Sequence, residues 1–271
     1  MESWDINFNN LTIGYDQKVI LKDISSTLPK GKISIVLGES GCGKSTLLKH
    51  IIGLSKPISG NINIGGHDLF SLSNKEFRRI RKHMGVLFQD GALLGALTLA
   101  QNVTLPLSEH LNLSKAELDD EANRVLSMVG LQNFGSYYPN ELSGGMRKRA
   151  GLARAIITNP KILLCDEPTS GLDPITADKM DNLLKEMHNL FTDMTIVVVS
   201  HDLSSLKKIA DHVLVLHDKI AIFSGNITEL QQQDNPYLQR FLNRHSEDEE
   251  KTFKKGMNSK VQSALDQWLS S

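Results

Sequence analysis

The sequence is poor in cysteine, carries almost no net charge and lacks long apolar runs. Its two cysteines, Cys42 and Cys165, cannot form a disulfide framework, which favours a protein of a reducing compartment. Lys and Arg number 30 and Asp and Glu 31, which excludes a histone-like basic binder and gives no reason to expect nucleic acid as a partner. The longest apolar stretches are strand-sized, far below the roughly 20 residues of a membrane-spanning helix, and no export signal opens the sequence. We therefore expect a soluble protein.

Short apolar runs alternate with helical patterns along the chain. Strand-like runs occupy residues 6–8, 11–13, 19–21 and 24–28, and mainly apolar runs typical of buried strands follow at 33–37, 162–165 and 196–200. Apolar residues at helical spacing occur at 46–52 and 176–191. Because strands that alternate with helices form parallel sheets, the pattern predicts an α/β fold.

Two further segments depart from this alternation. Residues 90–155 are mainly helical in pattern, with Ser114 and Glu117 spaced as a capping box, and they predict an inserted α-helical subdomain. We place the main domain at residues 1–235 and a C-terminal extension at 236–271. In the extension, a charged run at 246–255 predicts a solvated linker or frayed helix. One amphipathic helix is predicted after it, with an apolar face made by Val261, Leu265, Trp268 and Leu269.

A glycine-rich segment lies between the strand at 33–37 and the helix that follows. Residues 38–45 match the pattern G-x-x-x-x-G-K-[ST] of a phosphate-binding loop. Glycines let successive N–H groups turn toward phosphate oxygens, and the helix N-terminus adds positive charge. Lys44 is expected to reach the β- and γ-phosphates, and Ser45 to bind Mg²⁺. The predicted nucleoside triphosphate site consists of Gly38, Glu39, Ser40, Gly41, Cys42, Gly43, Lys44, Ser45 and Thr46.

The strand at 162–165 ends in two adjacent carboxylates, Asp166 and Glu167. Neighbouring side chains in a strand point to opposite faces, so the two cannot share a role. We expect Asp166 to bind Mg²⁺ and Glu167 to act as general base for the attacking water. The alternative is an acidic strand end that caps a helix.

A second anion-binding segment, Ser143, Gly144 and Gly145, precedes another helix. The loop at 38–45 already provides a binding site for the phosphates of one nucleotide, so a second anion-binding segment is not required for the same nucleotide. We therefore expect the second segment to serve a nucleotide bound by another copy of the chain.

Together these motifs resemble the ATP-binding subunit of ABC transporters, over about residues 5–225. The resemblance implies a P-loop NTPase (RecA-like) core with a parallel sheet, an N-terminal antiparallel β-subdomain, and ATP with Mg²⁺ as ligands. It implies that Tyr15 stacks on adenine, that Gln89 touches Mg²⁺ and the attacking water, and that Asp173 lies at the dimer seam. His201 then contacts the γ-phosphate. The alternatives are a core tyrosine, an ordinary loop glutamine and a structural histidine.

The resemblance also implies a head-to-tail dimer that closes on ATP, opens after hydrolysis and moves transmembrane permease subunits. One residue departs from the family pattern: Met146 stands where glutamine is usual. We expect the serine and glycine cap to survive, whereas a polar contact from this position to the nucleotide is in doubt.

Secondary features resemble the MlaF-type ATPases of phospholipid (Mla) transport, where methionine at this position is the pattern. These features are the segments 88–94, 101–107 and 143–149. The resemblance implies an MCE-type lipid-binding protein and a small accessory subunit as partners, at the cytoplasmic side of the inner membrane. It also implies that the C-terminal helix contacts the second copy; packing on its own domain is the alternative. An ABC ATPase for amino acids or lipoproteins is the second candidate. A DNA-repair or translation ATPase of the superfamily fits less well, because only about 98 residues separate Lys44 from Leu142 and the motifs occur once.

Overall fold

The computed structural model describes residues 4–15, 18–243, 260–261 and 267–270. The chain divides into two units, residues 1–233 and 234–271. The first unit contains both sheets, and the second contains α9 (Pro236–Leu242). Within the described residues, none of the helices has the length and apolar character needed to cross a membrane.

An antiparallel sheet is built from the N-terminal residues. It contains β1 (Ile6–Tyr15), β2 (Lys18–Leu28), β4 (Ser59–Ile64) and β5 (His67–Asp68), in the order β2-β1-β4-β5. The prediction of four short strands before residue 30 was wrong, because the runs join across irregularities in the strand register.

The irregularities in β1 and β2 are centred on polar residues with a left-handed backbone. Asn10 has φ 44° and Asp23 has φ 51°, a conformation that Asn and Asp tolerate better than most residues. The Asn10 N–H donates to Ser25 Oγ (3.0 Å) and the Asp23 N–H to Thr12 Oγ1 (3.2 Å). Polar residues such as these break the apolar pattern of the sequence, so each strand was predicted as two short runs, although the strand itself continues through them.

The second sheet is mostly parallel. It contains β3 (Ile33–Leu37), β6 (Met84–Leu87), β7 (Ile162–Asp166), β8 (Thr195–Ser200), β9 (His212–His217) and β10 (Ile220–Gly225), in the order β10-β9-β3-β8-β7-β6. Only the β9–β10 pair is antiparallel. This architecture confirms the predicted α/β class. Because β8 lies between β3 and β7, the carboxyl ends of these three strands meet at one edge, where ligands bind in such sheets.

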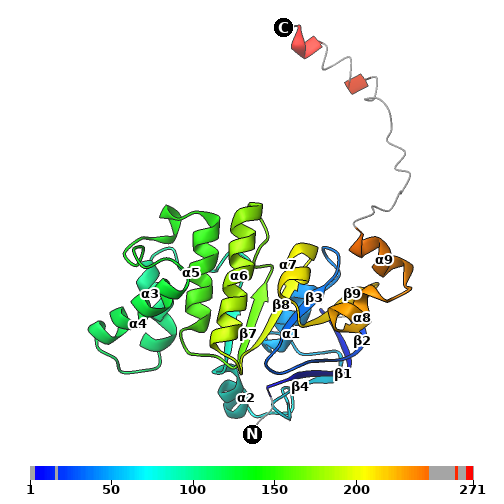
Figure 1. The fold of residues 1–271 in the computed structure, drawn as a ribbon, viewed down its shortest axis with the longest axis horizontal. Coiled ribbons are helices and arrows are strands. Elements are labelled where there is room, and N and C mark those ends of the chain that lie inside the picture. The colour runs from blue at the N-terminus through cyan, green and yellow to red at the C-terminus, as the bar shows by residue number, and fades with distance from the viewer. Residues whose placement is uncertain (1–3, 16–17, 244–259, 262–266, 271) are drawn as a thin grey trace. The chain divides into compact units, whose positions relative to one another are not determined.

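Helices follow the strands or form the insert. They are α1 (Lys44–Ile51), α2 (Asn74–Arg81), α3 (Leu99–Ser108), α4 (Lys115–Met128), the 3₁₀ turn η1 (Pro139–Glu141), α5 (Gly144–Ile156), α6 (Pro174–Leu190), α7 (Leu203–Ile209) and α8 (Ile227–Gln231). Helices α3, α4 and α5 contact one another and gather on one side of the parallel sheet, away from β1 and β4 (Figure 1). The predicted capping box of α4 is confirmed: the Glu117 N–H donates to Ser114 Oγ (3.3 Å), and the Ser114 N–H to Glu117 Oε2 (2.7 Å).

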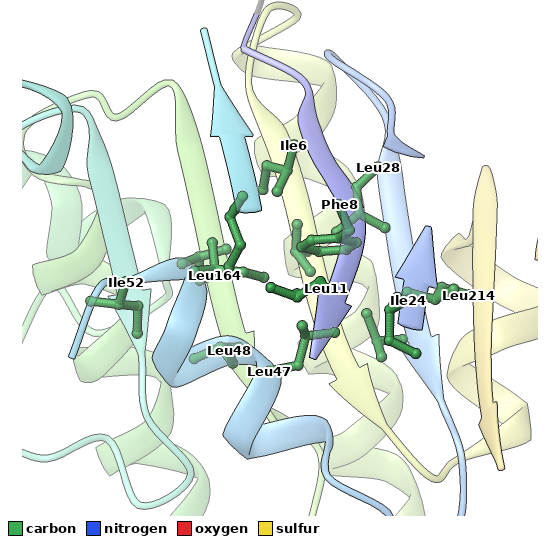
Figure 2. Packing of buried hydrophobic residues seen from close by; sticks show 14 of the residues in the cluster. Ile6, Phe8, Leu11, Ile24, Leu28, Leu47, Leu48, Ile52, Leu164 and Leu214 are labelled. Atoms are coloured by element: carbon green, nitrogen blue, oxygen red, sulfur yellow. The ribbon is translucent and has the colours of Figure 1, made fainter. Parts of the chain in front are cut away.

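The helix after the glycine-rich loop is held in the core. Leu47 and Leu48 of α1 are almost fully buried in a cluster with residues of β1 and the parallel sheet, among them Leu11 and Leu164 (Figure 2). Burial of one leucine side chain contributes about 1.5–3 kcal/mol. This packing fixes the position of the loop that precedes α1.

Part of the predicted C-terminal helix lies outside the described residues, as do Leu265 and the charged run at 246–255. Val261, Trp268 and Leu269, the other residues of its predicted apolar face, are exposed. The domain boundary at residue 235 stays a prediction.

Candidate nucleotide-binding site

The glycine-rich loop joins β3 to α1 in a conformation that depends on its glycines. Gly43 is the N-cap of α1, with φ 109°. A Cβ at Gly43 would lie 2.8 Å from Ile20 Cγ2, and one at Gly38 would lie 2.5 Å from the Leu216 carbonyl oxygen. At the tip, the Cys42 N–H donates to the Glu39 carbonyl (3.3 Å). The predicted loop is therefore a closely packed turn.

The Lys44 side chain is buried beneath this loop. Its Nζ donates to the carbonyl oxygens of Gly38 (2.8 Å) and Glu39 (2.9 Å), and it lies 3.7 Å from Glu167 Oε1. Its exposure is only 5%. A buried ammonium inside a turn of backbone N–H groups suits the negative charge of a polyphosphate.

Ser45 and Asp166 come from different elements and are in direct contact. Ser45 Oγ donates to Asp166 Oδ1 at 2.9 Å, which brings the start of α1 to the end of β7. Burial raises the pKa of Asp166 above its ordinary value, and the hydrogen bond from Ser45 partly offsets this. A hydroxyl and a carboxylate oxygen are donors that Mg²⁺ prefers, so this pair fits the predicted metal role.

Glu167 follows β7 with an unusual backbone conformation. Its φ is 48°, and its N–H donates to the Val199 carbonyl (3.0 Å). Its carboxylate lies 2.9 Å from His201 Nδ1, measured to Oε2, and close to Lys44. Left-handed backbone costs a residue with a side chain about 1–2 kcal/mol, and such strain is concentrated at functional sites.

A cavity of about 330 Å³ joins most of these groups. Its walls bring the loop together with Gln89, Glu167 and His201, which are far apart in the sequence. Two lining residues, Ile20 and Ser170, are not among the predicted site residues, and apolar Ile20 carries no chemical signal. The complete lining is Ile20, Ser40, Gly41, Gly43, Lys44, Ser45, Thr46, Gln89, Glu167, Ser170 and His201.

Several predicted site residues lie elsewhere. Tyr15 ends β1 with a side chain that is 44% exposed, and Asp173 caps α6 by accepting hydrogen bonds from the N–H groups of Ile175 (3.1 Å) and Thr176 (3.0 Å). These hydrogen bonds lower the pKa of Asp173. Neither residue lines the 330 Å³ cavity.

The second anion-binding segment is also outside this cavity. Ser143 is the N-cap of α5, and its Oγ accepts a hydrogen bond from the Met146 N–H (3.3 Å). Ser143 and Gly144 are exposed, whereas a Cβ at Gly145 would lie 2.6 Å from Thr176 Cγ2 of α6. The chain therefore does not bring residues 143–145 to its own glycine-rich loop.

Comparison with known proteins places these features in a family. A sequence model described as "ABC transporter" matches residues 21–170. The probable ribonucleotide transport ATP-binding protein mkl of Mycobacterium tuberculosis is 42% identical over 238 residues, which are 88% of this chain and 66% of mkl. The methionine import ATP-binding protein MetN of Desulfitobacterium hafniense is 42% identical over 80% of this chain and 64% of its own length. The chain thus spans slightly less than two thirds of these two relatives.

A phospholipid-transport relative is matched over more of its length. The intermembrane phospholipid transport system ATP-binding protein MlaF of Haemophilus influenzae is 38% identical over 242 residues, 89% of this chain and 91% of that protein. Among solved structures, a dimeric ATP-binding cassette in a post-hydrolysis state, bound to ADP and phosphate, is similar with a TM-score of 0.74 and 31% identity. The match covers 82% of this chain and 98% of that one. The chain belongs to the ABC transporter family.

Proposed function

We propose that this chain hydrolyses ATP in a head-to-tail dimer and thereby energises phospholipid transport of the Mla type. The observation that carries the ATPase part is the single cavity shared by Lys44, Gln89, Glu167 and His201.

Each group in this cavity has a distinct task. The loop and Lys44 bind the phosphates, and Ser45, Asp166 and Gln89 would hold Mg²⁺, which would neutralise charge on the phosphate oxygens. Glu167 accepts a proton from the attacking water, and His201 orients the Glu167 carboxylate, which it contacts at 2.9 Å, and reaches the γ-phosphate.

The remaining predicted residues act at the edges of the nucleotide. Tyr15 is exposed and free to stack on adenine, and Asp173 lies at the seam between copies. Residues 143–145 cap the nucleotide held by the other copy. The exposure of Ser143 and the dimeric assembly of the related cassette support this arrangement.

The substrate is the finer part of the proposal. The names of relatives differ, since they specify ribonucleotide, methionine and phospholipid. Met146 and the basic run after it favour the phospholipid branch, because they resemble the MlaF pattern. The partners are then permease subunits, an MCE-type lipid-binding protein and a small accessory subunit, at the cytoplasmic side of the inner membrane.

Replacement of Glu167 tests the ATPase part. Glu167→Gln keeps the shape of the side chain but removes the base, so we expect ATP binding to persist, turnover to fall by about 10²–10⁴-fold and an ATP-bound dimer to accumulate. Glu186→Gln, an exposed change on α6, is the control and should behave as wild type. Phosphate release and gel filtration with ATP measure both effects. Wild-type turnover by Glu167→Gln would refute the assigned base.

Purification of the complex in mild detergent tests the substrate. We expect phospholipid to co-purify with the permease, and phospholipid in nanodiscs to stimulate ATP hydrolysis. Methionine and ribonucleotides are the comparison ligands. Stimulation by either of these, with none by phospholipid, would assign the chain to a different transport system while leaving the ATPase proposal intact.

A further inference from the structure

The basic run at 147–149 sends its three side chains to different places. Arg147 Nη1 donates to the Leu142 carbonyl (2.6 Å), and Arg149 Nη1 donates to the carbonyls of Val129 (2.9 Å) and Gly130 (3.2 Å). Lys148 instead turns toward the nucleotide site. Its Nζ donates to the Glu167 carbonyl (2.9 Å) and the Ser170 carbonyl (2.6 Å).

Burial of the Lys148 ammonium group costs free energy, because the charge is removed from water. Its exposure is 5%, and desolvation lowers the pKa of its ammonium group, while the carboxylates of Asp90, Glu167 and Asp166 act in the opposite direction. An apolar side chain of similar length would fill the same space without removing a charge from water. Packing alone therefore does not explain a lysine here.

The two carbonyls that Lys148 binds belong to residues that line the cavity, Glu167 and Ser170. Glu167 has the strained φ of 48°, and its main chain is held on one side by Val199 and on the other by Lys148. Together with the Ser170 N–H, which also donates to the Glu167 carbonyl (3.2 Å), these contacts hold the main chain that carries the Glu167 carboxylate, while Lys44 and His201 contact the carboxylate itself.

Lys148 lies in the N-terminal half of α5, close to the end of the helix that begins with residues 143–145. It lies five residues after Ser143, about 7–8 Å along a rigid helix. The same helix contacts the loop after Gln89, because Arg154 donates to the carbonyls of Gly91 (2.9 Å) and Ala92 (2.9 Å). Helix α5 thus joins residues 143–145 to two catalytic segments of its own chain.

We propose that Lys148 is a positioning residue that couples the two nucleotide sites of the dimer. When the triphosphate held by the second copy binds residues 143–145, α5 carries the displacement through Lys148 to the main chain of Glu167 and so orients the general base. This inference rests on the proposed function. It adds Lys148, and the path from residues 143–145 through α5 to Glu167, to the roles that the sequence motifs predict.

Lys148→Met tests the coupling, since it keeps the bulk and removes the donor. We expect kcat to fall by about tenfold or more with KM for ATP changed by less than about twofold, because Lys148 does not line the cavity. Coupling of the two sites predicts a sigmoidal dependence of the wild-type rate on ATP concentration, and Lys148→Met should abolish it. Lys148→Arg should recover much of kcat, because a guanidinium can also donate to two carbonyls.

Arg149→Met is the matched control. Arg149 is on the same helix and also bridges two carbonyls, but those carbonyls follow α4 and do not line the cavity. We expect this variant to lose thermal stability and keep wild-type kcat and cooperativity. If Lys148→Met does not fold, Lys148→Leu, which also lacks a donor, is judged by the same criteria.

The outcomes are separable. Wild-type kcat and cooperativity in Lys148→Met, with Glu167→Gln inactive and dimeric, would overturn the coupling and leave the proposed function standing. Equal loss of kcat in Lys148→Met and Arg149→Met would also overturn it, because both changes would then act through stability. An active Glu167→Gln would instead refute the proposed function.

Discussion

The glycine-rich loop and the start of α5 both suit phosphate, yet they differ in completeness. At the loop, Lys44 is buried, hydrogen-bonded to two carbonyls and close to Glu167. At α5, Ser143 is exposed and contributes to no wall of the 330 Å³ cavity. The loop is organised within one chain, whereas we propose that residues 143–145 act on a nucleotide held by a second copy. In that proposed dimer the contacts of residues 143–145 exist only in the closed state, so they can drive closure.

The largest effect is expected when two inactive variants, one altered in the loop and one at the start of α5, are mixed. Lys44→Ala disables the loop and Ser143→Arg disables the start of α5, so each alone should lose nearly all ATPase activity. In a mixed dimer, the intact loop of one chain meets the intact α5 of the other. With random pairing, half of the dimers contain one competent site, and we expect recovery of about a quarter of wild-type activity. Phosphate release after mixing measures it.

A chain carrying both substitutions is the control for the mixing experiment. Mixed with wild type, it forms dimers in which neither site has both an intact loop and an intact α5, so it should dilute activity. Full activity of Ser143→Arg alone would contradict a role for residues 143–145 in the other copy's site.

Two glycines of the loop show whether backbone conformation or packing against β2 sets the shape of the loop. Gly41 and Gly43 both have positive φ, 83° and 109°, but a Cβ at Gly41 would meet nothing within 4 Å, whereas one at Gly43 would meet Ile20 and Leu21. Gly41→Ala should therefore cost only backbone strain, about 1–2 kcal/mol, and Gly43→Ala should cost more. Nucleotide titration should show the larger loss of affinity in Gly43→Ala. Equal affinities would show that packing against β2 does not set the loop conformation.

The sequence predicts this site well where local order carries the information. The strand, glycine loop and helix at 33–52 are contiguous, so pattern alone locates Lys44 and Ser45. The contact of Ser45 with Asp166 needs the strand order β3-β8-β7, which no local pattern contains. Lys148 was missed for a related reason: in a run of three basic residues, nothing local distinguishes the one side chain that turns inward.

A buried carboxylate between α6 and α7 contrasts with the matched charge of Lys44. Asp181 of α6 accepts a hydrogen bond from Ser205 Oγ of α7 (2.9 Å), and its Oδ1 has no hydrogen-bond partner among the described residues. Burial raises the pKa of Asp181 to about 6 from an ordinary 3.8. Lys208 partly offsets this rise, and the charges of Asp202 and Asp178 add to it.

Asp181→Asn should therefore stabilise the protein, and the gain should depend on pH. The folded state of the wild type binds the Asp181 proton more tightly than the unfolded state, so the stability that Asp181 contributes is fully present below about pH 4 and is lost as pH rises through about 6. Asparagine does not titrate, so the advantage of the variant should grow over this range by about 3 kcal/mol, the free energy that corresponds to a pKa of about 6 against 3.8, and level off above pH 7. Glu186→Gln, an exposed change on the same helix, should show no comparable gain. Thermal unfolding from pH 5 to 8 measures the difference, and a gain independent of pH would mean that Asp181 is not the source, because only a titrating group produces that slope.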